Sequence, residues 1–216
     1  MNKFRYFFIT FLTVYSLSIN AQQDQKAKDI LDKVSATNKS YKTIEAEFIF
    51  TRENIQDNTK NTSKGKVDIK GNKYWLDLMG TESFYDGKTL WSFIKDANEV
   101  NITEPDPNEE GTLNPAKLFT IYESGFKYKF VGDKFENAKA LYEIDLFPKD
   151  LKKDYSRITL KIDKDKMQIS SFKRSDKNGI RYTIELTKIT PNVVLNDTKF
   201  TFDKKTHPKT QINDMR

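Results

Sequence analysis

The sequence lacks cysteine altogether, and it contains a single histidine and only eight glycines. Without cysteine there are no disulfides, so a hydrophobic core has to stabilise the fold. A bacterial lipoprotein carries its lipid on a cysteine, so this chain is not a lipoprotein itself. The absence of cysteine also excludes catalytic triads built on cysteine. With one histidine and no cysteine, a zinc site with several His or Cys ligands is excluded, and the sequence contains no glycine-rich phosphate loop.

The few residues that suggest enzyme chemistry do not form a convincing site. His207 lies in a stretch rich in lysine and threonine, which is typical of a solvated loop residue. Acidic pairs, Asp145 with Glu143 and Asp163 with Asp165, are compatible with glycosidase chemistry, but chance and surface solvation account for them. We therefore predict no catalytic residue, no metal ligand and no cofactor.

One apolar run is present, between residues 6 and 19, and it follows a basic start. It is shorter than the roughly 20 apolar residues that a membrane-spanning helix needs. It is also interrupted by hydroxyl side chains and ends at Ala21, before a polar stretch. These are the features of a secretory signal peptide rather than a membrane anchor. We predict that residues 1–21 are removed on export and that residues 22–216 form one domain.

The net charge is +6, from 37 basic and 31 acidic residues. Charges of the two signs are interspersed rather than gathered in blocks, so nucleic-acid binding is not predicted. A weak attraction to anionic membranes or acidic partners stays open.

The period of the apolar residues changes once along the chain. Between residues 24 and 39 it is helical, which predicts an amphipathic helix whose buried stripe is Ala27, Ile30, Leu31 and Val34. From Ile44 onward apolar and polar residues alternate, as in half-buried strands. Asp86-Gly87 predicts a tight hairpin. Asn114-Pro115 predicts the start of a short helix over residues 115–122.

The second half of the chain is predicted to be a meander, with strands at residues 127–131, 141–147, 157–163, 168–175, 180–190 and 199–202. About 11 sequential strands joined by tight turns predict one antiparallel sheet. A sheet of this size curls, and the helices would then place their apolar stripes inside the curl.

Aromatic residues make up 13% of the chain and recur at alternating strand positions. Most are expected to fill a β core, although a curled sheet under a helix can instead enclose a cavity for acyl chains. Composition does not decide between a filled and a hollow core. The residues that we expect on the inner face are Ile44, Phe48, Phe50, Tyr74, Leu76, Leu78, Trp91 and Phe93.

Short segments along the whole chain after residue 21 share the pattern and order of a known family. They are Leu31-Asp32-Lys33-Val34, Glu47-Phe48-Ile49-Phe50-Thr51, Gly65-Lys66-Val67, Asp86-Gly87-Lys88-Thr89-Leu90-Trp91, Asn114-Pro115-Ala116-Lys117-Leu118, and Phe200-Thr201-Phe202 followed by Asp214-Met215-Arg216. In this order they resemble the LolA family, the periplasmic outer-membrane lipoprotein carrier proteins.

The resemblance implies a mainly β (α+β) fold, an unclosed half-barrel of about 11 antiparallel strands with helices lidding a hydrophobic cavity. It implies a soluble periplasmic protein that receives triacylated lipoproteins from an ATP-driven inner-membrane transporter. Such a carrier hands them to an outer-membrane acceptor, and the inner-face residues would line its acyl-chain cavity. We expect a monomer.

One segment departs from the family pattern. Family members carry an Arg-Pro pair whose arginine bonds to the lid, and the matching place here reads Lys70-Gly71-Asn72-Lys73. Lys70 or Lys73 is expected to make a comparable lid contact, although lysine lacks the planar fork of arginine.

Three other classes of protein remain as alternatives. A periplasmic sensor or another lipid-binding module on the same half-barrel would bind a different partner, and the known sensors carry a second domain. A secreted glycosidase would need two carboxylates converging in a cleft. A structural or adhesive β-protein would have a filled core and bind no lipid.

The signal peptide gives the first testable prediction. Protein recovered after export should begin at Gln22, which mass spectrometry of the intact chain would detect as the loss of residues 1–21. Retention of the apolar run in the exported protein would contradict this prediction and favour a membrane anchor.

Overall fold

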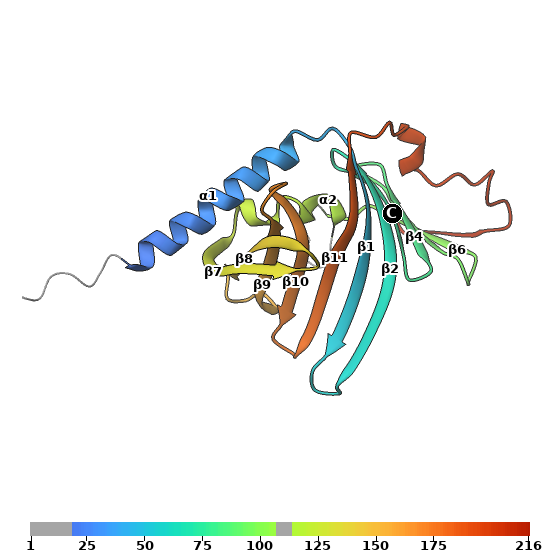
Figure 1. Cartoon of the computed structure of the whole chain (residues 1–216). Helices are drawn as coiled ribbons and strands as arrows, with labels where there is room; N and C mark the ends of the chain where they lie inside the picture. The colour runs from blue at the N-terminus through green and yellow to red at the C-terminus, as the bar shows by residue number, and fades with distance from the viewer. Residues whose placement is uncertain (1–18, 107–113) are drawn as a thin grey trace, which may run out of the picture.

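One continuous sheet dominates the computed structural model, which describes residues 19–106 and 114–216 (Figure 1). Its strands are β1 (Ile44–Asn54), β2 (Thr59–Lys70), β3 (Lys73–Leu78), β4 (Thr81–Tyr85), β5 (Leu90–Ile94), β6 (Glu99–Thr103), β7 (Phe126–Glu136), β8 (Lys139–Pro148), β9 (Tyr155–Asp163), β10 (Gln168–Asp176), β11 (Ile180–Pro191) and β12 (Gln211–Asp214).

The spatial order of the 12 strands is β12-β6-β5-β4-β3-β2-β1-β11-β10-β9-β8-β7. All neighbours are antiparallel except β12 and β6, which are parallel. Within the described part of the chain, β12 and β7 end this order and do not pair with each other. The prediction of a mainly β fold with an unclosed sheet is therefore confirmed, with one strand more than expected.

Few helices accompany the sheet. They are α1 (Ile19–Lys39), α2 (Pro115–Leu118) and the two 3-10 helices η1 (Ile121–Glu123) and η2 (Asp197–Phe200). Among the residues that the structure describes, no helix combines the length and the apolarity required to span a membrane.

The amphipathic helix α1 lies against β7 and β10 (Figure 1). Its predicted stripe is confirmed, since Ala27, Ile30, Leu31 and Val34 are all buried. The helix begins at Ile19, five residues earlier than predicted, so the expected cleavage site after Ala21 falls within its first turn. The rest of the predicted signal peptide, residues 1–18, lies outside the described residues.

We call the face of the sheet that packs against α1, α2 and η1 the inner face. Its side chains join the helix stripe in one large core. The strand residues in this core are Ile44, Ala46, Phe48, Val67, Ile69, Tyr74, Tyr85, Phe126, Ile144, Leu146, Ile158, Leu160, Ile162, Ile169, Phe172 and Leu186.

A second, smaller core lies on the opposite face, which we call the outer face. Trp75, Phe84 and Trp91 are direct neighbours across β3, β4 and β5. Phe84, Phe93 and Val100 form the buried centre, and Trp75, Trp91 and Phe202 pack around it. This part of the sheet is therefore apolar on both faces, and a segment near the C-terminus contributes to the outer core.

Most predicted elements are confirmed, and the Asp86 and Asn114 side chains make the hydrogen bonds expected at a turn and at a helix start. The Asp86 carboxylate accepts hydrogen bonds from the backbone N–H groups of Lys88 and Thr89, at 2.9 and 2.8 Å, and closes the β4–β5 hairpin. The Asn114 side chain accepts a hydrogen bond from the Ala116 N–H and caps α2. The predicted helix over residues 115–122 is divided into α2 and η1.

The predicted strand at residues 199–202 is wrong, because this segment contains the end of η2 instead. Asn196 accepts a hydrogen bond from the Thr198 N–H and starts that helix, and Phe200 is fully buried. The short strand β12 was not predicted, since it pairs with β6, more than a hundred residues away in sequence. Parallel pairing of this kind leaves no local turn signal.

Burial of Phe200 gives a prediction about stability. Phe200→Ala should lower the free energy of unfolding by about 3–5 kcal/mol, because a fully buried phenyl ring is replaced by a cavity. Chemical denaturation would measure the change. Val194→Ala, at a fully exposed position of the same segment, is the control and should have almost no effect. Equal stability of the two variants would contradict the structural role of η2.

Candidate functional site

The inner face brings together six of the eight residues that the sequence placed there: Ile44, Phe48, Phe50, Tyr74, Leu76 and Leu78. The register of the sheet explains this, since Ile44 is opposite Ile69 and Ile69 is opposite Tyr74. Side chains two residues apart on one strand point to the same face. The residues on β1 and β3 therefore form rows that run across the sheet.

These six residues differ in how accessible they are. Ile44, Phe48 and Tyr74 are buried, with exposed fractions of 7, 6 and 4%. Phe50, Leu76 and Leu78 are only half-buried at the border of the core. The inner face thus passes from a packed core under the helices to apolar surface that remains partly open.

Two half-buried neighbours on β11 extend this open surface. The rings of Phe50 and Tyr182 stack with their centroids 6.2 Å apart, and Ile184 is the direct cross-strand neighbour of Phe50. Tyr182 and Ile184 were not among the predicted site residues. Their spacing of two within a strand was the signal that could have identified them. We call Phe50, Leu76, Leu78, Tyr182 and Ile184 the apolar strip.

The assignment of Trp91 and Phe93 to the inner face is wrong. Leu90, not Trp91, is the residue opposite Tyr85 of the inner core. Trp91 and Phe93 consequently point to the outer face, where they pack in the second core. Both faces of β5 carry apolar residues, so alternation alone did not show which face was the inner one.

Gly65 on β2 makes room for the ring of its cross-strand partner Phe48. A Cβ atom at Gly65 would lie 2.3 Å from Phe48 Cζ, which is far inside van der Waals contact. The phenyl ring therefore lies over the glycine backbone. Any side chain at residue 65 would push the ring away from its present position.

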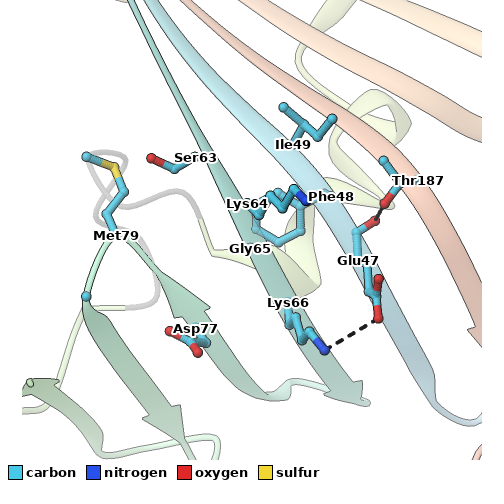
Figure 2. Close-up of a pocket in the computed structure, with 11 residues that line it drawn as sticks. Glu47, Phe48, Ile49, Ser63, Lys64, Gly65, Lys66, Asp77, Met79 and Thr187 are labelled. Carbon is cyan, nitrogen blue, oxygen red and sulfur yellow. Dashed lines mark hydrogen bonds and ion pairs between the residues drawn. The ribbon is translucent and has the colours of Figure 1, made fainter.

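An opening of about 720 Å³ lies beside this glycine (Figure 2). β3 pairs with β2 only from Gly65 to Lys70, so the first half of β2 extends beyond the end of β3. Phe48 and Met79 give the opening an apolar part, and the Glu47–Lys66 ion pair, at 3.5 Å, gives it a polar part. Glu47, Ile49 and Lys66 alternate with the inner-face residues Phe48 and Gly65, so most of the lining of this opening lies on the outer face.

Polar contacts connect α1 to the segment that contains α2 and η1. Ser35 Oγ donates to Glu123 at 2.6 Å, and Lys39 Nζ lies 2.9 Å from the same carboxylate. Asn38 Nδ2 donates to the Phe119 carbonyl at 3.0 Å. The hydrogen bonds from Ser35 and Lys39 hold the pKa of Glu123 below its usual value. The helices over the inner face are thus linked to one another by hydrogen bonds and an ion pair.

The predicted lid contact of Lys70 and Lys73 is corrected by the structure. Both lysines bind Asp197 at the start of η2, with Nζ to carboxylate distances of 2.7 and 2.9 Å. Hydrogen bonds from Lys70 and Lys73 lower the pKa of Asp197 to about 2. The side chains of these lysines share a face with Trp75, whose ring lies in the outer core. They therefore fasten the C-terminal segment to the sheet rather than α1 or α2.

The residues considered for catalysis have structural contacts. Asp145 accepts a hydrogen bond from Thr159 Oγ1 at 2.6 Å and pairs with Arg157 at 3.2 Å. Asp163 accepts hydrogen bonds from two backbone N–H groups in the β9–β10 turn. The His207 ring packs on Phe93, with centroids 4.8 Å apart, so it is not the solvated loop residue that we expected. In residues 19–106 and 114–216 no His, Cys, Asp or Glu cluster is suited to a metal ion.

An unclosed sheet whose apolar inner face is covered by helices defines a half-barrel class of β-proteins. The chain belongs to one family of this class, described as outer membrane lipoprotein carrier protein LolA, because the model of that family matches residues 17–178. This membership confirms the resemblance found in the sequence. The family is one of carrier proteins, and no curated protein matches the sequence.

Solved structures agree on the fold. An uncharacterized conserved protein from Thermus thermophilus is similar with a TM-score of 0.57 and 12% identity, over 88% of this chain and 99% of that chain. LprF from Mycobacterium bovis is similar with a TM-score of 0.50 and 14% identity, over 80% of this chain and 97% of that chain. At these identities the likeness concerns the fold alone.

Tyr74 gives a prediction about pH. Burial raises the pKa of its phenol to about 12, so the folded protein keeps this proton to higher pH than the unfolded chain does. The stabilisation is complete below about pH 10 and is lost as the pH rises toward 12. Tyr74→Phe should make the free energy of unfolding fall less steeply over this interval, by about 2 kcal/mol. Denaturation at several pH values would measure it, and parallel curves for the two proteins would contradict it.

Proposed function

We propose that the protein is a periplasmic carrier that takes up acylated lipoproteins released from the inner membrane and shuttles them to the outer membrane. The observation that carries the proposal is the apolar strip, which is half-buried on the inner face beside a packed core. Membership of the LolA family supports the same function.

The physical task of such a carrier is to keep acyl chains out of water. Burial of an acyl chain is worth about 0.8 kcal/mol per methylene group, so a lipoprotein does not cross an aqueous compartment unaided. The apolar strip offers aromatic and aliphatic surface of the same kind as the membrane interior. Because its five side chains are already partly exposed, the first contact with an acyl chain requires no unfolding.

The helices supply the cover for the cargo. α1 and the α2–η1 segment lie over the inner face and are linked through Glu123, Ser35 and Lys39. We expect them to move as one lid, since each polar contact joins one part of the cover to the other. Lid opening would expose Ile44, Phe48 and Tyr74 and enlarge the apolar strip. Release of the cargo then restores the packed core, which keeps the exchange reversible.

The partners follow from this function. An ATP-driven transporter in the inner membrane would supply the triacylated cargo, and an outer-membrane acceptor would receive it. Removal of residues 1–21 on export would place the carrier in the periplasm. A sensor or another lipid-binding module on the same fold is the alternative, and it would bind lipid without accepting a lipoprotein from the transporter.

A release assay tests the proposal. Mature protein is mixed with vesicles that contain the transporter and a triacylated lipoprotein, and the lipoprotein in the soluble fraction is measured with ATP present. Wild type should release it as a one-to-one complex. Phe50→Asp should reduce release at least tenfold, because a carboxylate on the apolar strip disfavours acyl-chain binding.

The matched control is Thr51→Asp, since Thr51 is the next residue of β1 and faces the other side of the sheet. This variant should release lipoprotein as wild type does, and denaturation curves would verify that both variants fold. Release by wild type that Phe50→Asp leaves unchanged would remove the apolar strip from the proposal. Absence of any soluble lipoprotein with wild type would overturn the carrier function and favour the sensor or lipid-binding alternative.

A further inference from the structure

An arginine lies at the end of the apolar strip. Arg52 follows Phe50 by two residues on β1, so both side chains lie on the inner face. Arg52 is directly opposite Tyr182, whose ring stacks on Phe50. Its side chain is half-buried, and in the described part of the chain it makes neither an ion pair nor a hydrogen bond.

Another arginine on the same face, unlike Arg52, is paired with carboxylates. Arg174 on β10 is the neighbour of Tyr182 on its other side. Its guanidinium pairs with Asp176, at 2.6 Å from Nε, and with Asp154, at 3.2 Å from Nη2. It also lies 5.1 Å from the centroid of the Tyr155 ring. Arg174 is thus held in place by two carboxylates, whereas Arg52 has its charge and its donors available.

Polar side chains lie next to Arg52 on the neighbouring strand β2. Opposite Arg52 on β2 lies Asn61, and opposite Phe50 lies Ser63. We call Arg52, Asn61 and Ser63 the rim. They present a guanidinium, an amide and a hydroxyl within about two residue steps, or roughly 7 Å, of the Phe50 ring of the apolar strip. An acyl chain on Phe50 and Ile184 would place its head group at this rim.

We infer that the inner face binds an amphiphile whose acyl chain lies on the apolar strip and whose anionic head group is held by Arg52. A guanidinium presents several N–H donors in a planar fork that fits carboxylate and phosphate oxygens. Either group can supply this chemistry. The inference rests on acyl-chain binding to the apolar strip in the proposed function. It adds a second class of ligand, because the lipid of a triacylated lipoprotein carries neither a phosphate nor a carboxylate.

The test uses three soluble probes with the same lauroyl chain, all below their micelle concentrations. Lauroyl-lysophosphatidylglycerol carries a phosphate, laurate carries a carboxylate, and monolaurin is uncharged. Their dissociation constants for the mature protein are measured by titration calorimetry. Wild type should bind at least one anionic probe about tenfold more tightly than monolaurin. The preference should shrink at high salt, because it is electrostatic.

Two variants distinguish binding of the head group from binding of the acyl chain. Arg52→Gln should weaken the favoured anionic probe about tenfold and leave monolaurin unchanged. Lys60→Gln removes the same charge from the other face of the hairpin, where Lys60 is opposite Glu53, and should keep the wild-type order of affinities. The probe that loses affinity in Arg52→Gln identifies the head group as a phosphate or a carboxylate.

Equal affinity of wild type for all three probes, or an unchanged preference in Arg52→Gln, would overturn this inference. If wild type nevertheless releases lipoprotein from vesicles, the carrier function stands without head-group selection. If no lauroyl probe binds and no lipoprotein is released, the inference and the proposed function both fail.

Discussion

Side chains on a β-strand alternate between two faces, and in a single continuous sheet this constraint divides the apolar strand residues between an inner and an outer face. One face carries the large core under α1 and α2, and the other carries a small core that the C-terminal segment helps to cover. β3 to β5 are apolar on both faces, so each face there needs its own cover. The C-terminal segment is fixed by Asp197, which binds Lys70 and Lys73, and by Lys199, which pairs with Asp68 and lies over the Trp75 ring.

The two apolar surfaces therefore have different roles. The outer core is centred on buried residues such as Phe84 and Phe93 and is closed by segments of the chain itself. The inner face is closed under the helices but half-open along the apolar strip, where the long strands β1 and β11 extend (Figure 1). A surface of this kind suits reversible binding, because acyl chains can replace side-chain contacts without breaking the sheet. The polar links between α1 and η1 join the two parts of the cover over the inner face.

Much of the fold could be predicted from the sequence, because local patterns determine it. The stripe of α1, the alternating strands and the turns at Asp86 and Asn114 all depend on neighbours close in sequence. The errors concern features that depend on distant parts of the chain. Trp91 and Phe93 were placed on the wrong face because both faces of β5 are apolar there, and β12 was missed because its partner β6 is remote. The role of Lys70 and Lys73 depends on Asp197, 124 residues or more away along the chain, which no spacing rule connects to them.

Acyl chains, in the proposed function, bind on the inner face along the apolar strip and not on the outer core. The most direct measurement uses the mature protein loaded with a lipoprotein that carries a photoactivatable group at the end of one acyl chain. After illumination, the cross-linked peptides are identified by mass spectrometry. We expect cross-links to β1 and β11, in the peptides that contain Phe50 and Ile184. Cross-links concentrated on Trp91 and Phe93 would contradict binding on the inner face.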